Sequence, residues 1–130
     1  QVAIKEGKGL GINVHESGTV VVIQGPRFST RSESREFSGH GWDVINMTQY
    51  PEGWLARELG ICYVNIALIT DYDAGLEDDP TIEAVTHAGV LQVFQENNHK
   101  LKELLYKMIA SIPDTRGEHC FCTQALEAAR

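Results

Sequence analysis

The sequence lacks any apolar run close to the about 18 residues that a membrane-spanning helix needs. It also lacks an excess of basic residues, because 11 Lys and Arg stand against 18 Asp and Glu and give a net charge of −7. A chain with this charge and no basic stripe is not expected to bind nucleic acid or an anionic membrane as its main partner.

Cysteine is scarce as well: the three are Cys62, Cys120 and Cys122. An odd number without regular spacing is not a secreted disulfide framework, so we expect a cytoplasmic protein. His119 beside the Cys120-x-Cys122 pair raises the question of a metal. Structural zinc takes four ligands and no second pair exists, so we expect none. A disulfide within the tail, a disulfide from Cys62 to the tail, and plain buried thiols all remain open.

What is present is typical of one modest globular domain: 130 residues, 42% hydrophobic and 22% charged. A β-branched run over residues 19–24 ends at a Gly-Pro pair and predicts a strand buried on both faces. Residues 43–48 and 61–70 are predicted as two further strands. The Gly-rich residues 1–17 are expected to form a loop or an edge ribbon.

Helices are predicted between and after these strands. Thr30 and Glu33 fit a capping box, which predicts a helix that begins there and ends at the glycines after residue 38. Two more are predicted over residues 52–59 and 86–112, the second from apolar residues recurring every three or four positions. Residues 74–80 are expected to form an acidic loop. The alternation of strands and helices predicts an α/β fold.

Three polar motifs follow the three predicted strands: residues 25–29, 46–48 and 70–73. Ligands of α/β sheets bind at the carboxyl ends of strands, so one site built from all three is expected. Asp71 and Asp73 are two residues apart and can face the same way. Such a pair can accept from an exocyclic amine, and a neighbouring charge or burial can raise one carboxyl pKa so that it acts as an acid. The alternative is an Asx turn in a solvated loop.

The other two motifs carry a flat apolar ring, a thioether and a hydroxyl. Phe28 can stack on a base, or it can pack in the core. Arg27 can hold a carboxylate of the fold itself. Met47 can pack on a sugar and Thr48 can bind an anion. The alternative for this motif is a plain turn in which Thr48 leads into the helix at Pro51.

Residues 18–34, 43–48 and 70–73, with 62–67 between them, resemble the trimeric purine nucleoside phosphorylases in order and spacing. The similarity covers roughly residues 18–110, and the Thr-Asp-x-Asp form is similar to the 5′-methylthioadenosine phosphorylases. The resemblance implies phosphorolysis: phosphate displaces the base from C1′, giving adenine and 5-methylthioribose 1-phosphate, with no cofactor and with phosphate as co-substrate. In that reaction Asp71 would protonate N7 of the leaving purine and Asp73 would hold its 6-amino group.

The remaining roles also come from the resemblance. Phe28 would lie against the base or ribose, Met47 would pack on the ribose, and Thr48 would contact phosphate. Ser29 and His87 occupy positions where the family tunes specificity.

The resemblance further implies half of a phosphorylase/hydrolase-like fold, with a twisted central mixed sheet flanked by helices. Residues 1–130 would be the C-terminal part of a single nucleoside phosphorylase domain. The family's Gly-rich phosphate loop and its Arg-His phosphate pair do not occur in the chain, so the N-terminal half is an expected partner. A homotrimer, or trimers paired into a hexamer, is expected. A broader phosphorylase acting on adenosine or inosine and a non-catalytic nucleoside-binding module remain alternatives.

Overall fold

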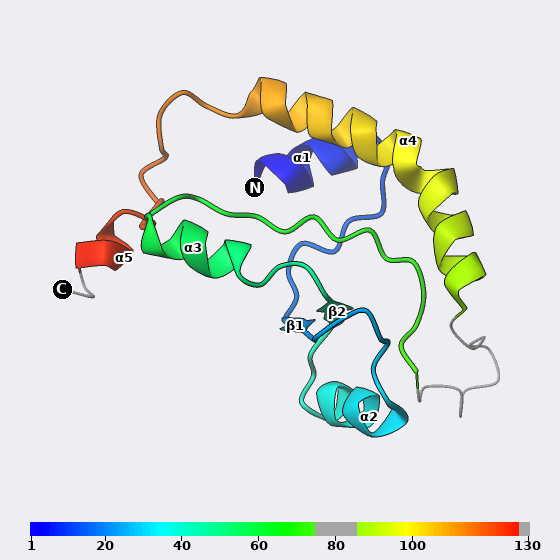
Figure 1. Ribbon diagram of the computed structural model, residues 1–130. Coiled ribbons are helices and arrows are strands. Elements are labelled where there is room, and N and C mark those ends of the chain that lie inside the picture. The colour runs from blue at the N-terminus through cyan, green and yellow to red at the C-terminus, as the bar shows by residue number, and fades with distance from the viewer. Residues whose placement is uncertain (75–85, 128–130) are drawn as a thin grey trace.

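The computed structural model describes residues 1–74 and 86–127, so nearly all of the expected acidic loop over residues 74–80 lies outside the described residues. These residues form five helices and two short strands, arranged as in Figure 1. In chain order they are α1 (Val2–Gly9), β1 (Val20–Val22), α2 (Arg31–Gly39), β2 (Val44–Asn46), α3 (Glu52–Glu58), α4 (His87–Ser111) and α5 (Gln124–Glu127).

The two strands form a parallel sheet, and α2 connects them. Val20 pairs with Val44 and Val22 with Asn46, and the Ile23 amide extends the ladder by donating to the Asn46 carbonyl at 2.9 Å. This strand-helix-strand unit confirms the α/β prediction for these segments. Both strands are shorter than the apolar runs that predicted them, because only three residue pairs share a ladder.

The third strand predicted over residues 61–70 is wrong, because the structure assigns no strand there. A strand is defined by backbone hydrogen bonds to a neighbour, and within the described residues only β1 and β2 pair. The segment is held instead through side chains: Asn65 Nδ2 donates to Gln49 Oε1 at 2.7 Å. The apolar composition of this run is therefore not enough to make it a strand, because no neighbouring strand among the described residues pairs with it.

The loop or edge ribbon predicted for residues 1–17 is also wrong, since its first half forms α1. Glycines disfavour helix by roughly 1 kcal/mol each, but packing can override that preference. Helix α1 packs against α4 (Figure 1). A Cβ on Gly7 would come within 2.7 Å of Val14 Cγ2, so the glycine allows a close approach that a larger residue would block. Ser111 Oγ adds a hydrogen bond to Glu6 Oε1 at 3.0 Å.

The predicted helix starts are confirmed. At α2, the Glu33 amide donates to Thr30 Oγ1 at 3.3 Å, and the Thr30 amide donates to Glu33 Oε2 at 2.7 Å. At α4, Thr86 accepts from the Gly89 amide at 3.1 Å. None of the described helices is long and apolar enough to cross a membrane.

Large apolar side chains are buried at few places. Among the described residues, the buried hydrophobic side chains are Leu104 and Met108, both on α4. Many others are exposed around α3 and the segment after it: Tyr50, Trp54, Leu55, Leu59, Ile61 and Val64. A group of exposed apolar side chains this large is typical of a face that packs against something else.

Candidate active site

The first and third polar motifs meet through one side-chain contact. Ser29 follows β1 and is 7% exposed, and its hydroxyl donates to Asp73 Oδ1 across 44 residues of chain. The other oxygen of this carboxylate, Asp73 Oδ2, is buried and has no hydrogen-bond partner among the described residues. A buried carboxylate oxygen without a donor is costly, so this atom is positioned to accept a hydrogen bond from a ligand.

The second motif joins the first where Met47 packs against the Gly25 backbone. A Cβ on Gly25 would lie 2.9 Å from Met47 Sδ, so only glycine lets the thioether come this close. The three motifs therefore adjoin: the first two follow the paired strands β1 and β2, and the third is brought to them by the Ser29–Asp73 contact. Sequence reasoning treated Gly25 as a turn residue and missed this close approach.

A polar network fixes the end of β2. Asn46 Oδ1 accepts from the Thr48 amide at 3.4 Å and from the Gln49 amide at 3.3 Å. Asn46 Nδ2 donates to Gln49 Oε1 at 3.3 Å, and the same oxygen accepts from Asn65. These bonds set the turn that presents Met47 and Thr48, and they tie it to the segment leading to Asp71.

Arg27 holds a carboxylate of the fold, as its sequence position suggested. Its Nη1 and Nη2 donate to the two Glu33 carboxylate oxygens at 2.8 and 2.7 Å, and Nη1 also donates to the Phe28 carbonyl at 3.0 Å. The Arg27 side chain and the Thr30 amide and hydroxyl lower the pKa of Glu33 from 4.5 to about 2. The network therefore fixes the backbone on both sides of Ser29.

The other predicted site residues are less constrained. Phe28, Thr48, Asp71 and His87 are all exposed. Thr70 Oγ1 donates to Asp71 Oδ1, which orients that carboxylate from its own segment. His87 opens α4, where Thr86 caps the helix as predicted. Within the described part of the chain, no hydrogen bond or ring contact joins His87 to the three motifs.

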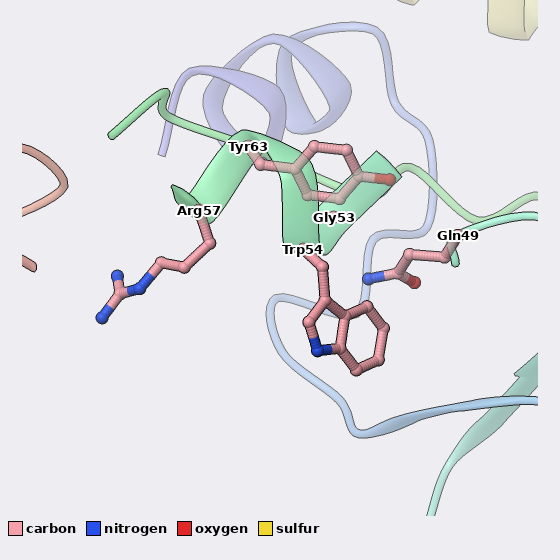
Figure 2. Close-up of a pocket in the computed structure, with 5 residues that line it drawn as sticks. All are labelled: Gln49, Gly53, Trp54, Arg57 and Tyr63. Carbon is pink, nitrogen blue, oxygen red and sulfur yellow. The ribbon is translucent and has the colours of Figure 1, made fainter. Parts of the chain in front are cut away.

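A hollow of about 280 Å³ lies elsewhere, on α3 and the residues beside it (Figure 2). Its lining residues are Gln49, Gly53, Trp54, Arg57 and Tyr63, and none of them was predicted as a site residue. In Figure 2 the Arg57 guanidinium points outward, away from Gln49. The hollow belongs to the exposed apolar face of α3, whereas the Asp73 oxygen without a described partner marks the three polar motifs as the candidate site.

Comparison with known proteins identifies the family of the chain. The family model described as the phosphorylase superfamily matches residues 1–110. The chain belongs to this superfamily. The resemblance inferred from the three motifs is thereby confirmed.

Sequence relatives include two S-methyl-5′-thioadenosine phosphorylases. The chain is 46% identical to that of Thermofilum pendens over 129 residues, which cover 99% of this chain and 47% of the relative. It is 48% identical to that of Pyrococcus abyssi over 127 residues, covering 98% and 46%. A purine nucleoside phosphorylase of Streptomyces coelicolor is 42% identical over 124 residues, covering 95% and 43%. The chain thus spans about half the length of the relatives it matches.

The solved structures give the same coverage. An adenosine/methylthioadenosine phosphorylase variant from Schistosoma mansoni, in complex with adenine, matches with a TM-score of 0.85 and 31% identity. It covers 100% of this chain and 51% of that one. Another variant of that enzyme, in complex with methylthioadenosine, matches with a TM-score of 0.81 and 30% identity, covering 100% and 49%.

Proposed function

We propose that this chain forms the purine- and ribose-binding part of a 5′-methylthioadenosine phosphorylase. The whole enzyme would cleave the N-glycosidic bond of 5′-methylthioadenosine with phosphate, giving adenine and 5-methylthioribose 1-phosphate. The chain's similarity to S-methyl-5′-thioadenosine phosphorylases over nearly its full length supports this reaction.

One observation carries the choice of an aminopurine. Asp73 uses one carboxylate oxygen to accept from Ser29, and its other oxygen is buried with no donor in the part of the chain that the structure describes. A carboxylate is an acceptor only, so it matches a 6-amino group, which donates, better than a 6-oxo group, which accepts. Discrimination is strong when a buried polar group would be left unpaired by the wrong ligand.

Asp71 would act as the general acid that protonates N7 as the base leaves. Cleavage builds negative charge on the purine and positive charge on the ribose, so a positioned acid and a phosphate dianion stabilise opposite ends of the transition state. Met47 would pack on the ribose, beside the Gly25 backbone that it already contacts. Phe28 would lie against the base or ribose, next to the Ser29 hydroxyl.

Phosphate binding requires more ligands than the predicted site residues of this chain provide. Thr48 is the one predicted phosphate ligand, and a dianion in a cleft requires several donors or cations. We propose that a further segment of the enzyme supplies them, completes the twisted mixed sheet and covers the apolar face of α3. The exposed Trp54, Leu55 and Leu59 side chains support such a contact. The homotrimer expected from the resemblance and the cytoplasmic location stay predictions.

The test is phosphate-dependent release of adenine by the full-length protein that contains these residues. With 5′-methylthioadenosine as substrate, adenine should appear only when phosphate is present. Adenosine and inosine, compared side by side, separate the methylthioadenosine enzyme from a broader phosphorylase. The isolated 130 residues should bind a nucleoside weakly and release no adenine. Phosphate-dependent turnover by these residues alone, or a preference for inosine, would contradict the proposal.

A second candidate, a phosphorylase that also accepts adenosine, is favoured by His87. This residue opens α4, at a position where the resemblance places a reader of the 5′ end of the nucleoside. An imidazole can bond a 5′-hydroxyl, whereas a methylthio group offers it little. We therefore expect methylthioadenosine to be preferred and adenosine to be accepted.

A further inference from the structure

The three cysteines of the chain converge beside the end of α3, where the C-terminal segment returns to it (Figure 1). Their sulfur atoms all lie within 4.8 Å of one another, and Cys62 Sγ and Cys120 Sγ are 3.2 Å apart. These thiols come from two segments far apart in sequence, and the nucleoside-binding motifs do not use them.

Local backbone structure places each segment. Helix α3 ends at Glu58, and Gly60 follows with a φ of +63°, which is easily adopted only by glycine. The Ile61 amide donates back to the Ala56 carbonyl at 2.8 Å. Cys62 follows directly. In the tail, the Cys120 amide closes a turn onto the Gly117 carbonyl at 2.9 Å.

The tail pair is held from its other side by α5. The Phe121 carbonyl accepts from the Ala125 amide at 3.2 Å as this helix begins. Cys120 and Cys122 thus lie between a turn and a helix start, and both sulfurs reach the same point as Cys62.

The spacing fits a shared metal ion. Zinc-sulfur bonds are about 2.3 Å, which puts tetrahedral thiolates about 3.8 Å apart, within the range that these three sulfurs span.

We propose that Cys62, Cys120 and Cys122 bind one Zn²⁺ through three thiolates, with a fourth position open to water. Each thiol releases its proton to solvent as its sulfur binds the ion, and no electron is transferred. The ion would link the C-terminal segment to the end of α3. A disulfide would occupy only two of the three sulfurs, and a bond between residues i and i+2 is strained.

The sequence did not predict this site, because it offered one cysteine pair where structural zinc takes four ligands. The structure adds Cys62 as a third ligand, and three protein ligands with an open fourth position are a common zinc arrangement. No local pattern in the sequence indicates that the C-terminal segment folds back to the end of α3.

The test uses the reduced, metal-free full-length protein with Co²⁺ as a spectroscopic probe and Zn²⁺ as competitor. Thiolate-to-cobalt charge-transfer absorption should saturate at one ion per chain and disappear when Zn²⁺ is added. Alkylation mapped by mass spectrometry should show Cys62, Cys120 and Cys122 protected by Zn²⁺ and reactive again after chelation.

Variants separate this site from incidental binding. Cys62→Ser and Cys122→Ser should each weaken Co²⁺ binding by more than roughly 100-fold, since even outer-shell changes cost 10–100-fold. Thr123→Ala, at the exposed neighbour of Cys122, should bind as the wild type does. Three outcomes would overturn the proposal: no charge-transfer band, unchanged affinity in Cys62→Ser, or formation of a disulfide among these cysteines despite bound Zn²⁺.

Discussion

Arg27 binds Glu33 through two parallel hydrogen bonds of 2.8 and 2.7 Å, and this pair lies directly beside Phe28 and Ser29. Glu33 also completes the capping box of α2 with Thr30. One carboxylate therefore joins the start of a helix to the loop that carries two predicted site residues. A planar guanidinium suits this two-point contact, which a lysine cannot reproduce.

The Arg27–Glu33 pair predicts that the loop carrying Phe28 and Ser29 is less stable in acid. The pKa of Glu33 is lowered to about 2 by Arg27 and Thr30, from an ordinary value of 4.5. Its stabilising effect is therefore fully present above about pH 4.5 and is lost as pH falls through about 2. Glu33→Gln should lower Tm at pH 7, and its difference from wild type should shrink between pH 4.5 and 2.

Thermal unfolding followed by circular dichroism measures this difference. Glu103→Gln, at an exposed glutamate of α4, is the control and should leave the pH profile unchanged. A Glu33→Gln deficit that stays the same at every pH would show that the carboxylate charge does not act through this network.

The elements that sequence predicted well are those set by local chemistry. The Thr30–Glu33 box and the Thr86 cap fix helix starts within one turn, so residue types at fixed offsets suffice to find them. The three polar motifs were also found, because each has a recognisable polar pattern. The first two follow β1 and β2, whereas the third follows a segment that forms no strand and meets the first through the Ser29–Asp73 contact.

The errors lie where structure depends on a distant partner. Residues 61–70 have the composition of a strand but pair with no described backbone, and α1 forms although its glycines disfavour helix, with α4 packed against it. The Cys62–Cys120 approach likewise depends on how the tail returns. None of these contacts leaves a periodic signal in the local sequence.

The Ser29–Asp73 contact predicts a binding defect. In the complete enzyme, Ser29→Ala removes the donor to Asp73 Oδ1 and leaves the carboxylate free to shift. Losing a hydrogen bond to a charged group costs about 1.5–3 kcal/mol, so KM for aminopurine nucleosides should rise roughly 10- to 100-fold. Steady-state kinetics should show a smaller change in kcat. Ser32→Ala, at an exposed serine on α2, should behave as wild type. An unchanged KM in Ser29→Ala would separate Asp73 from base recognition.

Asp71 predicts the opposite pattern. If it protonates the leaving purine, Asp71→Asn should lower kcat by roughly 10²–10⁴ while substrate binding suffers less. Single-turnover adenine release measures the chemical step directly. Asp114→Asn, at an exposed aspartate of the tail, is the matched control. Turnover by Asp71→Asn close to that of the wild type would remove the general-acid role.

His87 predicts substrate choice. It opens α4 behind the Thr86 cap, and its exposed side chain is free of hydrogen bonds to other described residues. An imidazole here can bond the 5′-hydroxyl of adenosine but gains nothing comparable from a methylthio group. His87→Val should therefore lower kcat/KM for adenosine by a factor that corresponds to about 1–3 kcal/mol, which is the scale of one lost hydrogen bond in a closed site. It should leave kcat/KM for methylthioadenosine unchanged. His99→Val, on the same helix and also exposed, controls for the lower helix propensity of valine. Both substrates should be assayed in one preparation, because the prediction concerns their ratio. Equal losses on both, or none on either, would mean that His87 is a surface residue of the first turn and that the 5′ end is recognised elsewhere.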